Sequence, residues 1–156
     1  MIRPPFPVRG QRGSYLVEAA IGVPLLLGLV FLIVDVGWTL FAKATLQHAV
    51  REGVRYAVTG RAAGKLGQTA SIQQVVIENS AGLLSGQPET IRVRFYRPDN
   101  QAEVNDNSGG NVVVVSVEGY AIKSLLPYMH SCDTVIASAH AGDRLESSPP
   151  GGPPAL

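Results

Sequence analysis

The sequence predicts an α+β protein in which a long N-terminal transmembrane helix continues as an amphipathic helix, followed by a second helix and a small antiparallel β-sheet. Three observations predict this class. An uncharged apolar run extends from Ala19 to Val34, an apolar stripe at helical spacing lies between Leu46 and Ala57, and apolar residues alternate with arginines from Ile91 onward. The length of 156 residues allows one small domain beside the membrane segment.

Composition excludes several function classes. The chain carries 13 Lys+Arg against 12 Asp+Glu, so bulk electrostatics do not favour nucleic-acid binding. Its single cysteine, Cys132, excludes an intramolecular disulfide and a cysteine-based zinc finger. The segment from Gly60 to Lys65 departs from the phosphate-binding loop pattern in its glycine spacing and in Leu66. We therefore expect no enzyme activity, no cofactor and no small-molecule substrate.

The apolar run predicts a single transmembrane helix. The run from Ala19 to Val34 covers roughly 24 Å at about 1.5 Å per residue, which is short of a hydrocarbon core of roughly 30 Å. A helix from Ser14 to Leu40 reaches about 40 Å and places Tyr15 and Trp38 near opposite membrane interfaces. We assign residues 1–13 to a basic leader and 14–42 to the span.

Charge predicts the orientation of the span. The leader carries basic residues and no acid, whereas basic residues after the span are accompanied by an acid. The basic residues are Arg3, Arg9 and Arg12 before the span and Lys43, Arg51 and Arg55 after it. The positive-inside rule places the N-terminus in the cytoplasm and the C-terminal domain outside.

The residues that open the helix, from Gly13 to Glu18, resemble the type IV prepilin processing site. The resemblance implies cleavage after Gly13, so that Ser14 becomes the new N-terminus and Glu18 the fifth residue. A carboxylate in a membrane helix persists where it has a partner or lies close to water. Pairing of Glu18 with the Ser14 amine of a neighbouring subunit would set the register between helices, and shallow placement of Glu18 is the simpler alternative.

The resemblance extends further along the chain. Pro24, followed by three leucines, predicts a helix kink because proline lacks an amide donor. Asp35 lies near the end of the span, where we expect it to be hydrated. The segment from Ala49 to Ala57, AVREGVRYA, follows the span.

Together these elements resemble TadE-like proteins, the minor pseudopilins of tight-adherence (Tad) pilus systems. The resemblance covers about residues 9–60, and it implies a family signature in Arg51, Glu52, Gly53, Arg55 and Tyr56. It implies a single-pass protein of the inner membrane. Its expected partners are a prepilin peptidase, other pilins or pseudopilins and the Tad assembly platform.

Periodicity predicts the remaining elements. Residues 43–60 form an amphipathic extension whose apolar stripe packs on the exported domain, 61–146, and whose charged face is solvated. A second helix, capped by Thr69 or Ser71, runs to about Leu84. Strands are expected over residues 91–96, 111–121 and 134–140, with a hairpin loop over 99–110, a short turn or helix over 124–126, and meander order with one helix on the sheet. The tail, 147–156, is expected to be disordered.

Other polar residues have simple structural explanations. His130, Cys132 and His140 are conceivable metal ligands, but no complete site accompanies them. The arginines at 92, 94 and 97 are expected to form a solvated strand face, balanced by Asp99 and Glu103.

Two other functions compete with the pseudopilin hypothesis. Ala42-Lys43-Ala44 fits a signal-peptide cleavage site, which predicts a secreted binding domain. An uncleaved membrane anchor with an exported binding domain is the third possibility.

Overall fold

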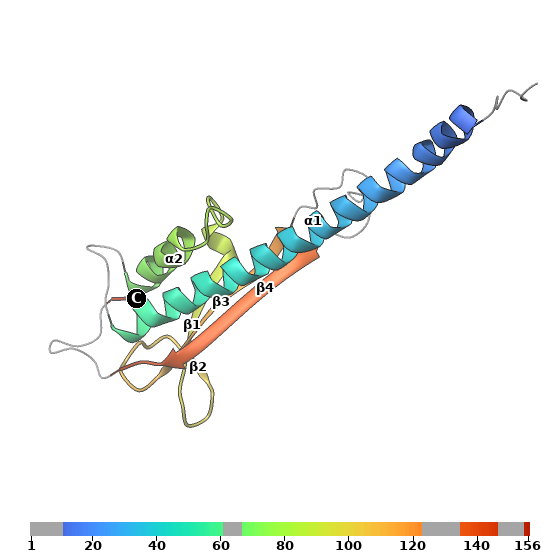
Figure 1. Cartoon of the computed structure of the whole chain (residues 1–156). Coiled ribbons are helices and arrows are strands. Elements are labelled where there is room, and N and C mark those ends of the chain that lie inside the picture. Colours follow the sequence, from blue (N-terminus) through green and yellow to red (C-terminus); the bar gives the residue numbers. More distant parts are fainter. Residues whose placement is uncertain (1–10, 61–66, 123–134, 147–154) are drawn as a thin grey trace, which may run out of the picture.

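The computed structural model describes residues 11–60, 67–122, 135–146 and 155–156 of the chain. The elements form one long helix, a shorter helix and a four-stranded antiparallel sheet, as the sequence predicts (Figure 1). In chain order they are α1 (Gln11–Val58), α2 (Gln68–Glu78), a 3₁₀ turn (Pro88–Thr90), β1 (Ile91–Tyr96), β2 (Glu103–Val104), β3 (Val112–Ile122) and β4 (Val135–Arg144).

The predicted membrane and amphipathic helices form one uninterrupted helix. α1 contains 48 residues, which corresponds to about 72 Å. Its N-terminal half extends away from the rest of the protein, and its C-terminal half lies along the sheet (Figure 1). The side chains change from exposed to buried at Ala42, which has no exposed surface, directly after the half-exposed Phe41. α1 therefore enters the domain at Ala42, the last residue that the sequence analysis assigns to the span.

The predicted apolar stripe of α1 forms one wall of the hydrophobic core. Each of its positions is buried: Leu46, Ala49, Val50, Gly53, Val54 and Ala57. Facing side chains come from α2 and the inner face of the sheet; among them are Ile72, Val76, Phe95, Val113, Val115 and Val117. The amphipathic pattern thus serves to cover one face of the sheet.

The sheet contains the three predicted strands in the predicted meander order, β1-β3-β4, and one further strand. Its order is β2-β1-β3-β4, and every pair is antiparallel. The three predicted strands are neighbours, but the expected hairpin loop contains β2, which pairs with β1 and forms an edge. Both helices, rather than one, pack on the same face of the sheet (Figure 1). The predicted third strand is also longer than expected and extends to Arg144.

The start and end of α2 also differ from the prediction. Its N-cap is Gly67, and the Ser71 hydroxyl donates to the Gly67 carbonyl (2.9 Å) instead of capping the helix. The helix ends at Glu78, and a series of turns carries the chain to Leu84, which is fully buried. Within these turns Ala81 and Gly82 have positive φ values of 50° and 83°, outside the range of a right-handed helix.

A buried polar network joins the C-terminal end of α1 to α2. The side-chain amide of Gln68, 1% exposed, donates to the Ala57 carbonyl (3.2 Å). Its oxygen accepts a hydrogen bond from Asn107 Nδ2 (2.6 Å), which comes from the loop between β2 and β3. The backbone amide of Gln68 donates to the Ala155 carbonyl (2.6 Å). Residue 155 thus contacts the domain, whereas residues 147–154 of the predicted tail lie outside the described part of the chain.

The same loop is organised by Asp106. Its carboxylate accepts hydrogen bonds from the hydroxyl and the backbone amide of Ser108 and from Asn111 Nδ2. These hydrogen bonds hold the pKa of the Asp106 carboxyl below its ordinary value, the Ser108 hydroxyl contributing most.

Candidate functional site

The candidate functional site is the exposed apolar part of α1. From Gly13 to Val34 every side chain is exposed, and this region supplies the one candidate membrane span found among the described residues. A helix from Ser14 to Phe41 extends about 42 Å, enough to cross the hydrocarbon core and enter both headgroup layers. The described part of the domain covers none of this surface, and an exposed apolar surface of this extent is typical of a membrane-spanning or helix-packing segment.

The predicted processing site lies at the beginning of α1. The helix starts at Gln11, so Gly13 and Ser14 occupy its first turn. The first amides of a helix lack intrahelical acceptors, so this turn opens at small cost. Such opening would expose an extended backbone to a peptidase. Cleavage after Gly13 stays a prediction.

Glu18 lies one helical turn after Ser14, and its side chain is exposed among apolar neighbours. This placement leaves the carboxylate accessible from the side of the helix, as the predicted pairing with another subunit requires.

Pro24 lies within α1, which continues through it (Figure 1). The predicted register role and the predicted kink stay predictions. Asp35 is half-buried and takes part in a polar or electrostatic interaction.

Gly53 lies where α1 crosses α2 and the sheet. A methyl group at this position would lie 2.5 Å from Val76 Cγ2, 3.6 Å from Ile72 Cγ2 and 3.8 Å from Val115 Cγ1. The first distance is far below van der Waals contact, so glycine permits the close approach of α1 and α2. The sequence places Gly53 in the apolar stripe but does not reveal this packing role.

The other predicted signature residues lie on or beside the solvent face of α1. Arg51 and Arg55 are exposed, as expected for a solvated face, and Glu52 and Tyr56 are half-buried. The two arginines line an open groove of about 660 Å³ between α1 and β4. Across it lie His140, Asp143 and Glu146. Gln47 bridges the groove by donating from Nε2 to the His140 carbonyl (3.0 Å), which fastens β4 to α1.

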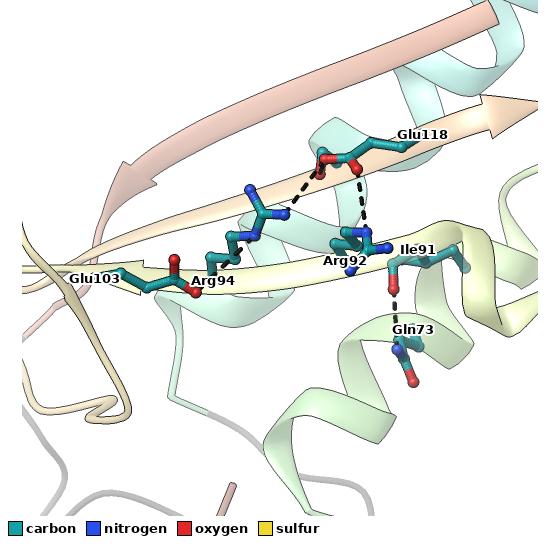
Figure 2. A network of polar contacts seen from close by, with 7 residues as sticks. Gln73, Ile91, Arg92, Arg94, Glu103 and Glu118 are labelled. Atoms are coloured by element: carbon teal, nitrogen blue, oxygen red, sulfur yellow. Dashed lines mark hydrogen bonds and ion pairs between the residues drawn. The ribbon is translucent and has the colours of Figure 1, made fainter. Parts of the chain in front are cut away.

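The arginines of β1 form ion pairs on the outer face of the sheet, away from the helices. Arg92 Nε lies 3.1 Å from Glu118 Oε2, and Arg94 lies 3.8 Å from Glu118 and 4.0 Å from Glu103 (Figure 2). The Tyr96 side chain and the Glu118 charge raise the pKa of Arg94 above its ordinary value. Of the two acids expected to balance this face, Glu103 pairs with Arg94, whereas the other partner is Glu118 and not Asp99. Sequence analysis missed Glu118 because strand register brings it beside β1.

Gln73 provides a polar contact on the other face of the sheet. Its side-chain amide donates from α2 to the Ile91 carbonyl (3.1 Å), where the chain enters β1 (Figure 2). This bond holds α2 against the beginning of the sheet.

The conceivable metal ligands are not brought together in the described part of the chain. His140 is exposed on β4, whereas His130 and Cys132, like the predicted turn at 124–126, lie outside the described residues. Among the residues that the structure describes, no group of three His, Cys, Asp or Glu side chains could hold a metal ion.

The fold and the exposed helix define a membrane-anchored protein with a small α+β domain. Residues 13–55 match the family model described as TadE-like protein. This match confirms the predicted resemblance to TadE-like proteins, and it relates the chain to components of the Tad pilus system. The roles of the individual signature residues stay predictions. Neither the curated proteins nor the solved structures give a significant match.

Proposed function

We propose that this chain is a minor pseudopilin of the Tad pilus system. It is cut after Gly13 by a prepilin peptidase and held in the inner membrane before or during assembly. Its N-terminus faces the cytoplasm, and its domain is displayed outside. The match of residues 13–55 to the TadE-like family supports this role. The function is structural and includes no catalysis.

The observation that carries the proposal is the division of α1. Up to Phe41 the large apolar side chains of the helix are exposed, and from Ala42 onward one face of the same helix is buried in the hydrophobic core. Lateral association of such helices can replace lipid contacts with contacts between subunits while the domain stays folded. Assembly machinery can therefore extract the subunit from the bilayer without dismantling its core.

Glu18 supplies the register in this mechanism. Cleavage after Gly13 creates an amine at Ser14, and pairing of this amine with Glu18 of a neighbouring subunit compensates two charges in an apolar setting. Apolar side chains alone pack with little axial preference, so one such pair fixes how far one helix is shifted along the next.

A secreted domain behind an ordinary signal peptide is disfavoured by the packing of Ala42. Cleavage after Ala44 would remove Ala42, which has no exposed surface and belongs to the core cluster. It would also create a chain end inside α1, which continues for more than three turns beyond this point. An uncleaved membrane anchor fits the packing equally well, and only processing separates it from the proposal.

Mass spectrometry of the N-terminus, on a membrane fraction of the native host, tests the proposal. We expect a chain that starts at Ser14. A soluble chain that starts at Thr45 would establish secretion, and an intact membrane-bound chain would establish a simple anchor. Gly13→Leu should accumulate as the unprocessed form, whereas Gly10→Leu, a matched change in the leader, should still be cut.

The register role requires a separate experiment. Glu18→Ala should be processed and inserted into the membrane but should fail to support pilus assembly. Glu78→Ala, which removes an exposed carboxylate from α2, is the control and should assemble normally. Normal pili with Glu18→Ala would refute the register role.

A further inference from the structure

The start of β4 carries exposed apolar side chains that the fold does not explain. In the described residues beyond Phe41, the exposed large apolar side chains are Val135, Ile136 and Leu156. Ile136 is 68% exposed and Val135 is 43% exposed, and they are adjacent in the chain. Neighbours in a strand point to opposite faces of the sheet, so this end of the sheet is apolar on both faces.

The hydrogen bonds between β4 and α1 define the level of this apolar end along the helix. β4 runs in the same direction as α1 (Figure 1). Gln47 of α1 is hydrogen-bonded to His140, and Val58, later in α1, is hydrogen-bonded to Glu146, which follows β4. Ile136 precedes His140 by four residues, which is roughly 13 Å of strand and equals about nine residues of helix. Counting back from Gln47 places Ile136 level with the turn that contains Trp38 and Phe41.

That turn of α1 is the end of the membrane span. The rings of Trp38 and Phe41 stack with centroids 5.7 Å apart, and both are exposed. Indole rings favour the layer between hydrocarbon and water. An apolar sheet end at the same height therefore lies at the membrane surface.

Polarity along β4 changes in the direction that a membrane requires. On its outer face the exposed side chains are Ile136, Ser138, His140 and Arg144 in order of increasing distance from the span. On β3, Ala121 pairs with Ile136, while Ser116 pairs with His140. The face is apolar next to the span, becomes polar from the serine onward and ends in a charged residue.

We propose that the span-proximal end of the sheet, formed by Val135 and Ile136 of β4, inserts into the interfacial layer of the bilayer beside Trp38. The occupant of this surface is lipid, contacted at the boundary between headgroups and acyl chains. The domain thus rests on the membrane with two elements, α1 and the end of β4. The proposal rests on membrane insertion of α1 and not on pilus assembly.

Depth-dependent quenching of tryptophan fluorescence tests this placement. Trp38 is the only tryptophan of the chain, so the full-length protein reports on the span in vesicles of phosphatidylcholine and phosphatidylglycerol brominated near the glycerol end of the acyl chains. Two variants in a Trp38→Phe background move the reporter, one with Ile136→Trp and the other with His140→Trp. Both positions are exposed on the same face of β4, so both accept the larger side chain.

The two variants should differ strongly. Their reporters lie about 13 Å apart along the strand, close to half the hydrocarbon thickness, so we expect quenching at position 136 to be at least about twofold that at position 140. The reporter at 136 should also emit at shorter wavelength. Equal quenching at both positions would overturn the proposal. Blue-shifted but unquenched emission at 136 would overturn it as well, because protein would then cover Ile136. Absence of quenching at Trp38 would refute the membrane insertion on which the proposal rests.

Discussion

Replacement of Gly53 is predicted to separate α1 from α2. In Gly53→Ala the added methyl group would meet Val76 Cγ2 at 2.5 Å. Val76 is fully buried and branched at Cβ, so it has one strongly preferred rotamer in a helix and cannot turn away. Relief of the overlap therefore requires movement of α2.

The expected magnitude follows from two opposing effects. Overpacking of a core by one methyl group costs about 2 kcal/mol, whereas alanine is favoured over glycine inside a helix by about 1 kcal/mol. The net loss of about 1 kcal/mol corresponds to a melting temperature lower by about 4–8 °C for a domain of this size. Thermal unfolding of the full chain in detergent, followed by circular dichroism, measures this shift.

Two further variants make the test specific. Gly37→Ala is the same substitution in the same helix, but its methyl group meets nothing within 4 Å, so it should not lower the melting temperature. Val76→Ala removes the obstructing methyl groups and with them the overpacking cost, so combined with Gly53→Ala it should cost about 2 kcal/mol less than the two single changes together. An unchanged or raised melting temperature in Gly53→Ala would refute the packing explanation.

Three other predictions concern polar contacts. Gln68→Leu removes the buried oxygen that accepts from the Asn107 amide and should lower stability by about 1–3 kcal/mol in urea titration, whereas Gln74→Leu on the exposed face of α2 should have little effect. In the folded chain the pKa of Asp106 lies below its ordinary value of 3.8. The contribution of this carboxylate to stability is therefore present above about pH 4 and is lost as the pH falls through the lower folded pKa. Asp106→Asn should weaken the acid-induced part of unfolding, and an unchanged acid profile would contradict this. Glu118→Gln removes exposed ion pairs, so it should lower the melting temperature by at most a few degrees, and the difference should shrink in high salt; a large loss that salt does not affect would exclude this explanation.

The elements that could be predicted from the sequence are those with strong periodicity. The stripe from Leu46 to Ala57 repeats at helical spacing over three turns, and every position in it is buried as expected. β1 and β3 were recognisable because several consecutive residues favour a half-buried or central strand. The apolar length of α1 similarly predicted both the candidate span and the exposed surface of the site.

The features that sequence analysis missed depend on contacts between distant segments. β2 has only two residues, Glu103 and Val104, too few for an alternating pattern, and it exists because β1 offers an open edge. Gln68 is buried although glutamine is usually exposed, because Ala57 and Asn107 satisfy its side chain. The partnership of Arg92 with Glu118 depends on strand register, which no local pattern encodes.

The uninterrupted course of α1 also couples the position of the domain to the tilt of the membrane span. Val58 lies 17 residues beyond Phe41, so the helix extends about 25 Å past the end of the span. A tilt of about 20°, typical of single membrane helices, would displace that end sideways by about 9 Å. Because α1 is continuous from the span into the domain, the tilt angle of the membrane-spanning part determines where the outer end of the domain points. A torque applied to the domain is likewise transmitted directly to the part of α1 that lies in the bilayer.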